Sequence, residues 1–520
     1  MTRKIQITLP FDEDLEKHLQ QDMPKMVDFR ILHQSLDARS ANRGKAPTYH
    51  YTVEVIFAGE QFNAFHENYV DLGGFAEKPI IIGAGPAGLF CALRLAEYGI
   101  PAIIIERGER AERRMLQIAR HWRYGEFNPE NNVCYGEGGA GLFSDGKLIT
   151  RIKGPYVNYV MKKFVDFGAP AETAYMSNPH LGSNKIRALI NKITEYLKAR
   201  GHEFRYNTRV DEILFDESHA IGVKLHSQEK IFSRHIVLAT GHSAQEMYHF
   251  LQEKNIAMAA KNFAVGVRIE HPRREIDAIQ YGKFSENGQL GAARYKLSYQ
   301  SPQTKLGTYS FCMCPGGHVL SSGTDGDGLV VNGMSNFSRK GPWSNAALVV
   351  TVEKDLHFST DDVLGGLHFQ RAIEKKASAY SVALATGKEI PAQRVKDFLA
   401  AKNGSASLPK SSCPSGLFSL DLAQVLPAFV SENLRLALLQ FEKKLPGFSQ
   451  QNALLLAPET RTSAPVTILR DKLSLQSISK QGLYPCGEGA GHAGGITSAA
   501  VDGVKVAMAM IRKEKNYSDS

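Results

Sequence analysis

The sequence predicts an α/β fold built on a parallel sheet, with an inserted mixed α+β domain and a small N-terminal α+β domain. Two continuously apolar runs flank one amphipathic helix after residue 78, and strands that are apolar on both faces are typical of a parallel sheet covered by helices. A long stretch rich in Gly and Ser, 262–420, then interrupts this pattern. After Gly482 the chain returns to a strand, a glycine-rich turn and a helix.

The length of 520 residues suggests about three domains. We expect the first at 1–75, because the Gly73-Gly74 pair breaks the chain before the first buried strand. The parallel-sheet domain is expected to be discontinuous, at 76–261 and 421–520. The domain inserted at 262–420 would face the substrate.

The N-terminal domain combines alternating strands with one short helix. Asp12 is placed to cap a helix whose Leu15 and Leu19 share one face. The expected strands are Ile5–Leu9, Phe29–Leu32 and Tyr51–Phe57. We expect this domain to be a docking module or lid that contributes nothing to the cofactor fold.

A glycine-rich turn, Gly83-Ala84-Gly85-Pro86-Ala87-Gly88, lies between the first apolar strand and a helix that ends at Gly99. The glycines permit a tight turn, close approach of the backbone to a pyrophosphate, and close packing of helix on strand. The helix N-terminus supplies free N–H groups. Glu106 ends the next strand at the spacing expected for hydrogen bonds to a ribose. All of these features agree, so we predict a Rossmann-type dinucleotide site and favour it over a purely structural turn.

Further elements can be placed along the chain. A helix is predicted over 183–200, capped by Ser183 and ended by Gly201. Three strand-like runs follow it, RVDEILF, AIGVKL and IFSRHIVLAT. The inserted domain shows antiparallel-looking strands and a helix near Gly366–Ala379.

The choice of FAD over NAD comes only from resemblance. The run Ile236–Gly241, with Thr240 and Gly241 at its end, is similar to the A-T-G strand of two-step FAD folds of the glutathione-reductase and p-hydroxybenzoate-hydroxylase type. Gly482–Gly491 resembles their C-terminal flavin motif, in which an acid binds the ribityl chain and the next helix points its N-terminus at the flavin O2. Here that acid is Glu488, after Gly487, where most members have Asp, and the helix would begin near Gly494-Gly495-Ile496. Its N–H groups would stabilise negative charge on the reduced flavin.

A second resemblance spans nearly the whole chain. It is to a bacterial family of uncharacterised FAD-dependent dehydrogenases, and it implies one FAD per chain without implying a substrate. The motifs that carry it are SLDAR (35–39), YGEGGAGLFSDGKL (135–148), CMCPGG (312–317), VNGMS (331–335), ETRTSAPV (459–466) and GEGAGHAGGITSAAVDG (487–503).

The glycine-rich segment 136–147 also fits the G-x-G-x-x-G spacing, but no long strand precedes it. We interpret it as a nest of backbone N–H groups closing over the FAD, with a plain loop as the alternative. The cofactor residues expected there are Gly139, Ala140, Gly141, Ser144, Asp145, Gly146 and Lys147. We therefore expect no second permanent nucleotide-binding domain. NADH or NADPH would bind only transiently.

Several other side chains are candidates for the site. Arg107 and Arg114 can pair with adenosine or phosphate groups, with a surface salt bridge as an equal alternative. Val210, at the start of a strand, is a further cofactor position. The catalytic candidates are Arg461, His492, Cys312 and Cys314. Their alternatives are a structural ion pair, an exposed loop histidine and two packed free thiols.

Composition narrows the function classes. The apolar content of 43%, the charged content of 22% and the net charge of +9 are ordinary for a globular protein, and the scattered Lys and Arg do not favour a nucleic-acid partner. Six cysteines without disulfide or zinc spacing, no signal peptide and no long apolar run indicate a cytoplasmic protein without a metal or membrane partner.

We predict an FAD-dependent oxidoreductase acting on a small or medium organic molecule. The alternatives are a flavoenzyme of RNA modification and a non-catalytic flavin-binding sensor.

Overall fold

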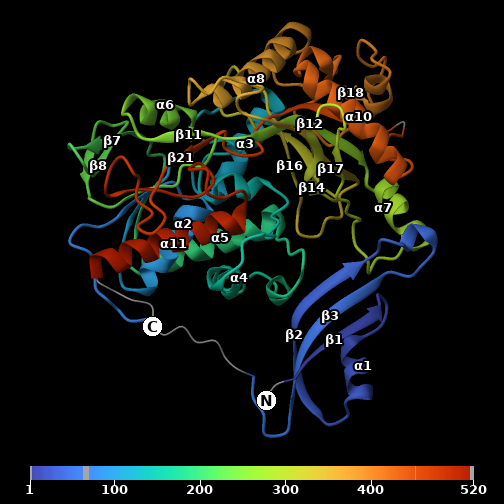
Figure 1. Cartoon of the computed structure of the whole chain (residues 1–520), viewed down its shortest axis with the longest axis horizontal. Helices are drawn as coiled ribbons and strands as arrows, with labels where there is room; N and C mark the ends of the chain where they lie inside the picture. Colours follow the sequence, from blue (N-terminus) through green and yellow to red (C-terminus); the bar gives the residue numbers. More distant parts are fainter. Residues whose placement is uncertain (1–2, 63–68, 451, 516–520) are drawn as a thin grey trace.

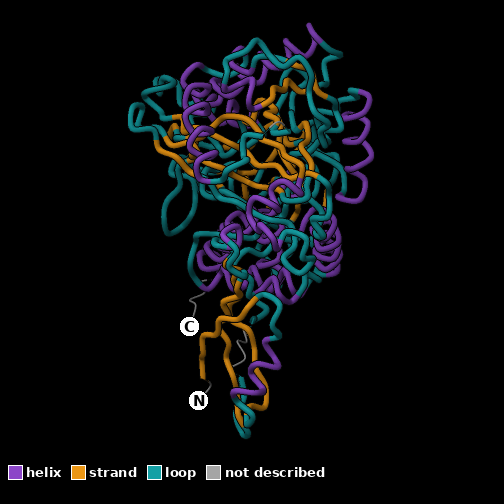
Figure 2. Tube along the Cα trace, turned by 90° about the vertical axis from the view of Figure 1, so that its right-hand side faces the viewer, coloured by secondary structure: helices purple, strands orange, loops and turns teal. Residues whose placement is uncertain are grey.

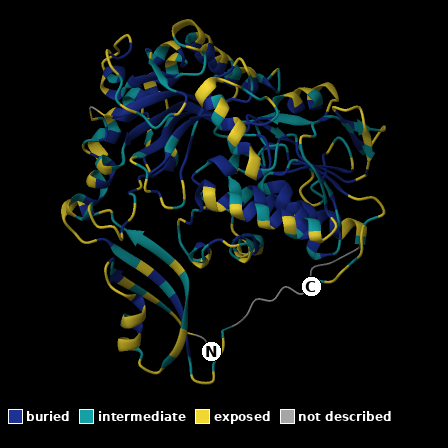
Figure 3. Cartoon of the chain, turned by 180° about the vertical axis from the view of Figure 1, so that it is seen from behind, coloured by how far each residue is buried: buried dark blue, intermediate teal, exposed yellow. Residues whose placement is uncertain are grey.

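The computed structural model describes residues 3–62, 69–450 and 452–515. Two large sheets form the body of the molecule, and the N-terminal strands extend from one end of it (Figures 1 and 2). Buried residues concentrate on these sheets and on the helix faces that cover them (Figure 3). No helix in the described part of the chain is long and apolar enough to cross a membrane.

The first large sheet has five strands in the order β22-β10-β4-β5-β6, and every neighbouring pair is parallel. Its strands are β4 (Ile80–Ile82), β5 (Ile103–Ile105), β6 (Glu203–Arg205), β10 (Ile236–Leu238) and β22 (Leu483–Pro485). Apolar residues fill the three inner strands, so that both faces are covered by protein. The predicted parallel sheet is confirmed.

Helices cover both faces of this sheet. They are α2 (Pro86–Glu97), α3 (Ala111–Tyr124), α4 (Pro155–Asp166), α5 (Gly182–Ala199), α6 (Gln245–Glu253) and α11 (Ile496–Lys515), with short 3₁₀ turns η2 (Gly139–Phe143) and η3 (Ala171–Ala174). Helix α11 crosses α2 so closely that a Cβ on Gly503 would lie 2.0 Å from the Ala87 carbonyl oxygen. Helix α11 begins at Ile496, as predicted.

The predicted Ser183 cap of the helix over 183–200 is wrong. Helix α5 begins at Gly182, and the Ser183 hydroxyl donates to the Ser144 carbonyl at 3.1 Å instead of capping the helix. The strand-like runs that follow form a small antiparallel sheet. Its strands are β7 (Val210–Phe215), β8 (Ala220–Leu225) and β9 (Lys230–Phe232).

The second large sheet has seven strands in the order β13-β14-β17-β12-β20-β18-β19, antiparallel except for β18 with β19. Its strands are β12 (Phe263–Pro272), β13 (Ser298–Gln300), β14 (Gly307–Cys314), β17 (Trp343–Val352), β18 (Ile390–Arg394), β19 (Leu417–Ser419) and β20 (Leu454–Glu459). Two small sheets accompany it, β11 (Met258–Ala260) with β21 (Val466–Ile468), and β15 (His318–Ser321) with β16 (Val331–Met334). The helices of this region are α7 (Arg273–Tyr281), α8 (Gly365–Leu384), α9 (Val395–Leu399) and α10 (Ala428–Lys444), with η4 (Gly282–Phe284) and η5 (Leu422–Gln424).

Strand β20 lies between β12 and β18, inside the seven-stranded sheet. The buried side chains of α10, among them Leu434 and Phe441, belong to the same apolar core. Residues up to Glu459 therefore pack with the inserted region. We propose to place its end there instead of at residue 420.

The N-terminal unit is a three-stranded antiparallel sheet in the order β1-β3-β2 with one helix. Its elements are β1 (Arg3–Pro10), α1 (Leu15–Asp22), β2 (Met26–Asp37), η1 (Ala41–Arg43) and β3 (Thr48–Phe57). Asp14, not Asp12, caps α1, because its carboxylate accepts from the Lys17 N–H at 3.0 Å. The unit contacts the body through two backbone hydrogen bonds of Gln34, one with Tyr175 and one with Ser177, and through Phe11 and Ala41, which are buried in the core of the seven-stranded sheet.

A second nucleotide-binding unit was not expected between Pro155 and Lys480. Apart from residue 451, which lies outside the described residues, this stretch supplies two strands of the five-stranded parallel sheet and otherwise antiparallel or mixed sheets. No second parallel sheet with a glycine-rich turn occurs in that described stretch, which confirms the prediction.

Candidate active site

One cavity of about 410 Å³ lies between the carboxyl ends of the parallel strands and the seven-stranded sheet. The parallel-sheet side supplies most of its lining. Phe311 and Cys312 of β14, Asn332 of β16 and Glu459 of β20 line it from the opposite side. The carboxyl edge of a parallel sheet is where ligands bind in open α/β folds, so this cavity is the candidate active site.

The three glycines of the first turn do different things. Gly83 has φ +106°, and a Cβ there would lie 2.4 Å from the Ala239 carbonyl oxygen. A Cβ on Gly88 would lie 2.0 Å from the Gly83 carbonyl oxygen, so this glycine lets α2 pack against the turn and does not line the cavity. Gly85 has extended φ and open space in front of it. Its backbone is therefore accessible from the cavity.

Glu106 lies at the cavity wall and is buried. Its carboxylate accepts three backbone N–H groups, from Ala84 at 2.9 Å, Gly108 at 3.0 Å and Gly136 at 2.9 Å. These bonds tie the first glycine turn to the loop that holds Gly136. Glu106 therefore organises the site as well as lining it.

Arg114 does not line the cavity, so the expectation that it contacts the cofactor is wrong. Its side chain is fully buried, and its guanidinium donates to five carbonyl oxygens at 2.7–3.3 Å. The acceptors are Asn132, Val133, Gly136, Glu137 and Gly139. Arg114 thus holds the second glycine-rich loop in shape from behind.

That loop runs along the cavity through residues 139–147. Gly138 and Gly139 both have left-handed φ, at 84° and 59°, and η2 follows directly. The lining residues are Gly139, Ala140, Gly141, Ser144, Asp145, Gly146 and Lys147. The Asp145 carboxylate itself is buried and is bound by Arg339 and Ser335, so this residue offers its backbone to the cavity.

The C-terminal segment meets the same cavity. Glu488, Gly495 and Ile496 line it, whereas Gly487 lies behind it, where a Cβ would be 2.7 Å from the Ala87 Cβ. Burial raises the pKa of the Glu488 carboxyl. His492 lies outside the cavity lining and its Nε2 is bonded to the Ile468 carbonyl at 3.0 Å, so its expected catalytic position is wrong.

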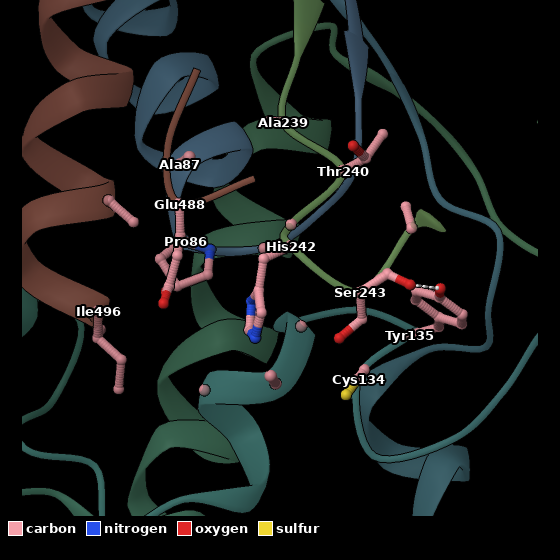
Figure 4. A pocket seen from close by; sticks show the side chains of 18 of the residues that line it. Pro86, Ala87, Cys134, Tyr135, Ala239, Thr240, His242, Ser243, Glu488 and Ile496 are labelled. Atoms are coloured by element: carbon pink, nitrogen blue, oxygen red, sulfur yellow. Dashed lines mark hydrogen bonds between the residues drawn. The ribbon is translucent and has the colours of Figure 1, made fainter. Parts of the chain in front are cut away.

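His242 was missed by sequence analysis. It directly follows Thr240 and Gly241, and its imidazole points into the cavity beside the Glu488 carboxylate (Figure 4). Its Nε2 donates to the Arg461 carbonyl at 3.0 Å, which leaves Nδ1 as an acceptor. The sequence signal that could have identified His242 is its position directly after the strand that ends in Ala239-Thr240-Gly241.

Tyr135 and Ser243 close the neighbouring wall, with the tyrosine hydroxyl donating to the Ser243 carbonyl (Figure 4). Arg107 and Val210 also line the cavity, together with Thr240 and Gly241. The Arg107 guanidinium lies 4.0 Å from the centre of the Tyr135 ring and donates to Glu130 at 2.8 Å. Arg107 therefore forms a salt bridge, the alternative considered for it, and lines the cavity at the same time.

The seven-stranded sheet contributes buried ion pairs. Arg268 is fully buried, and its Nε and Nη2 donate to the two oxygens of Glu459, each at 2.9 Å. Asn345 and Asn332 accept its remaining N–H groups at 2.8 and 3.2 Å. This network fixes Glu459 and Asn332 at the cavity, and sequence analysis did not find Arg268 because no local motif marks it.

Arg461 also belongs to an ion pair. Its guanidinium donates to both oxygens of buried Glu374, at 2.9 and 2.8 Å, and to Asp325 at 3.2 Å. Arg461 lines the cavity, as expected, and the structural ion pair is also observed, so its catalytic role stays a prediction. Of the two candidate cysteines, Cys312 lines the cavity and Cys314 lies buried behind it.

The cavity fits FAD. A Cβ on Gly241 or Gly495 would meet no atom within 4 Å, so the backbone is open to a ligand at both ends of the site, whereas the Gly494 N–H donates to the Ser498 hydroxyl. Among the described residues none donates a hydrogen bond to the Glu488 side chain, which leaves its carboxylate for a ligand hydroxyl. Gly85, Glu106, Thr240, Glu488 and Ile496 would hold the cofactor.

Comparison with known proteins decides the family. A model described as FAD-dependent protein, C-terminal domain-like, matches residues 262–462, close to the boundary proposed above. A model described as Pyridine nucleotide-disulphide oxidoreductase matches residues 77–253. An uncharacterized protein of Clostridium beijerinckii is 39% identical over 533 residues, covering 98% of each chain. The chain belongs to this bacterial family of FAD-dependent oxidoreductases.

Solved structures are more distant from this FAD-dependent oxidoreductase. L-proline dehydrogenase from P. horikoshii is 11% identical, with a TM-score of 0.38 over 84% of this chain and 94% of that one. Glycine oxidase from Bacillus cereus is 11% identical, with a TM-score of 0.32 over 84% of this chain and 98% of that one. Similarities of this size carry no argument about the substrate.

Proposed function

We propose that this FAD-dependent oxidoreductase is a dehydrogenase or reductase of a small or medium organic molecule, bound between the cofactor and the seven-stranded sheet. The observation that carries the proposal is that one cavity is lined from both sides. The cofactor-binding turns lie on one side, and Cys312, Asn332 and Glu459 lie on the other. Bound FAD supplies the electron transfer in such a site.

The residues of the chain would position the substrate and handle protons. The Arg268–Glu459 pair holds Asn332 and Glu459 in place, so their polar atoms are pre-oriented for a substrate. The Nδ1 of His242 is free to accept a proton, because the Nε2–H is directed to the Arg461 carbonyl. The buried walls keep water from the reacting groups.

We further propose that NADH or NADPH binds only transiently and that the partner is a small molecule, not a nucleic acid. No second nucleotide-binding unit occurs in the described part of the insert, which supports transient binding. The arginines that line the cavity, Arg107, Arg209 and Arg461, are already paired with acids, which does not favour a phosphate backbone there.

An anaerobic substrate screen on the purified holoprotein tests the proposal, with loss of the visible absorbance of oxidised flavin as the readout. A substrate found in this way should be turned over more slowly by His242→Ala and Asn332→Ala, while both variants keep their FAD. Lys340→Met, at an exposed position outside the cavity, is the control. Equal rates in the two cavity variants and the control would contradict the proposed binding mode.

A further inference from the structure

Cys312 and Cys314 lie at a bulge in β14. The strand pairs with β17 from Thr308–Val350 to Phe311–Ala347, and the register then shifts to Cys314–Asn345. Cys312 takes a left-handed φ of 46° at this point, which is unusual for a residue with a side chain. A bulge re-aims side chains that a regular strand would hold apart. Here it brings the Cys314 thiol to 3.3 Å from the Cys312 carbonyl oxygen and beside the Cys312 thiol.

Two cations lie next to this pair. The Lys147 ammonium donates to the Met313 carbonyl, between the two cysteines in sequence. The Arg268 Nη1 lies 3.3 Å from the Cys312 carbonyl oxygen and 3.9 Å from the Cys314 sulfur. The hydrogen bond from Cys314, with these positive charges, lowers the pKa of the Cys312 thiol to about 6, while the pKa of the Cys314 thiol is raised. The pair thus places the more acidic thiol at the cavity and the less acidic thiol behind it.

The other four cysteines differ. Burial raises the thiol pKa of Cys91, Cys134, Cys413 and Cys486. Cys134 and Cys486 also line the cavity, but Cys134 has no second thiol beside it. Cys486 has Cys91 and Arg470 nearby, yet burial and the Asp502 carboxylate raise the pKa of its thiol. A low thiol pKa, a resolving thiol and access to a site are what thiol–disulfide chemistry needs. Of the six cysteines, all of which are described, only Cys312 with Cys314 combines them.

We propose that Cys312 and Cys314 form a second redox centre, a dithiol that is reversibly converted to a disulfide by electron exchange with the FAD in the same cavity. In the oxidising direction the two sulfurs bond to each other, and the S–H bond of Cys314 breaks. Two electrons pass to the oxidised flavin, and one proton comes from Cys314 and one from solvent, which replaces the proton that Cys312 lost on ionising. The reverse step reduces the disulfide. This inference rests on FAD binding as proposed above.

A reductive titration of the holoenzyme counts the electrons. The protein is oxidised with diamide, freed of reagent and titrated anaerobically with dithionite. The wild-type chain should take up four electrons per FAD, two for the flavin and two for the disulfide. Cys312→Ser and Cys314→Ser should take up only two. Cys413→Ser removes a half-buried thiol outside the cavity and should match the wild type.

Peptide masses give a second readout that needs no variant. After diamide, the peptide that holds Cys312 and Cys314 should be lighter by two hydrogens and resist alkylation, and anaerobic photoreduction of the flavin should restore both. A flavin that is reduced normally while this peptide stays unchanged would overturn the second redox centre and leave the proposed function standing. A chain that binds no reducible flavin would instead overturn the proposed function itself.

Discussion

The parallel sheet presents mainly backbone to the cavity, whereas the seven-stranded sheet presents side chains held by buried ion pairs. On the first side, glycines at 85, 241 and 495 present their backbone to the cavity, and Gly83, whose N–H donates to the Ile105 carbonyl at 2.8 Å, shapes the turn. On the second side, Arg268 bonds to Glu459, Asn345 and Asn332 at once. A site made of backbone groups is disrupted when a side-chain atom is added to one of its glycines. A network of buried ion pairs is disrupted when one partner is removed.

The largest effect is expected where an atom is added to the backbone side. Gly83→Ala would place a Cβ 2.4 Å from the Ala239 carbonyl at a left-handed φ, so we expect a loss of roughly 4 kcal/mol or more and a protein purified without flavin. Gly85→Ala meets no protein atom closer than the Gly139 Cα at 4.0 Å, so the chain should fold, but the added Cβ faces the cofactor and should lower FAD affinity by about tenfold. Flavin content per chain measures both. Equal FAD retention in the two variants would remove the distinction between these glycines.

The second-largest effect is expected from removing one partner of the Arg268–Glu459 ion pair in the seven-stranded sheet. Arg268→Ala leaves Glu459 buried without its cation, and we expect the free energy of unfolding to fall by about 3–5 kcal/mol. The double variant Arg268→Met with Glu459→Leu removes both charges and should recover most of that loss. Denaturant unfolding followed by circular dichroism is the measurement. A double variant no more stable than the single one would show that the pair acts through packing and not through charge.

Each half buries a histidine whose pKa is lowered to about 4, and these two make a matched test of acid stability. Burial lowers the pKa of His202 in the parallel-sheet half and of His271 in the seven-stranded half to about 4, from 6.5. Because the folded pKa is the lower one, each histidine contributes stability above pH 6.5 that is lost as the pH falls towards 4. The full loss is about 3 kcal/mol for each.

Conservative substitutions can separate the two histidines. His202→Asn keeps an acceptor for the Ala102 N–H, and His271→Gln keeps a donor for the Phe448 carbonyl. Each should reduce the fall in stability between pH 6.5 and 4 by about 3 kcal/mol, and the exposed His33→Gln should leave it unchanged. A decline equally steep in all three variants would place the acid sensitivity elsewhere.

The smallest effect on the cofactor is expected from the N-terminal unit, which lines no part of the cavity although its Phe11 and Ala41 pack into the core of the seven-stranded sheet. A chain starting at Val70 would lose the two backbone bonds of Gln34 to Tyr175 and Ser177 but no residue of the cavity. We expect its FAD affinity to stay within a few-fold of the full chain, measured by titration of apoprotein. A folded truncated chain without flavin would show that this unit supports the cofactor site.

The same contrast explains what could be predicted from the sequence. Backbone sites need glycines at fixed spacing beside a strand and a helix, so Gly83 to Gly88, Glu106, Gly241 and Glu488 could all be found from local sequence. The side-chain network joins β12, β14, β16 and β20, which are up to roughly 190 residues apart in the chain. No local pattern marks such a set. Arg268 was therefore missed, Arg114 was assigned to a ligand although buried carbonyls bind it, and the pairing of Arg461 with Glu374 at the cavity could not be foreseen.

The contact of α2 with α11 has a consequence during protein synthesis. Helix α2 ends at Glu97 and α11 begins at Ile496, yet Gly503 packs directly on Ala87. A ribosome adding about 5–20 residues per second needs roughly 20–80 s to make the chain between them. For that time the first glycine turn exists without Glu488, Ile496 or the helix that buries α2. Flavin capture should therefore come after translation has passed α11, and a stalled nascent chain that exposes only the first half would not retain the cofactor.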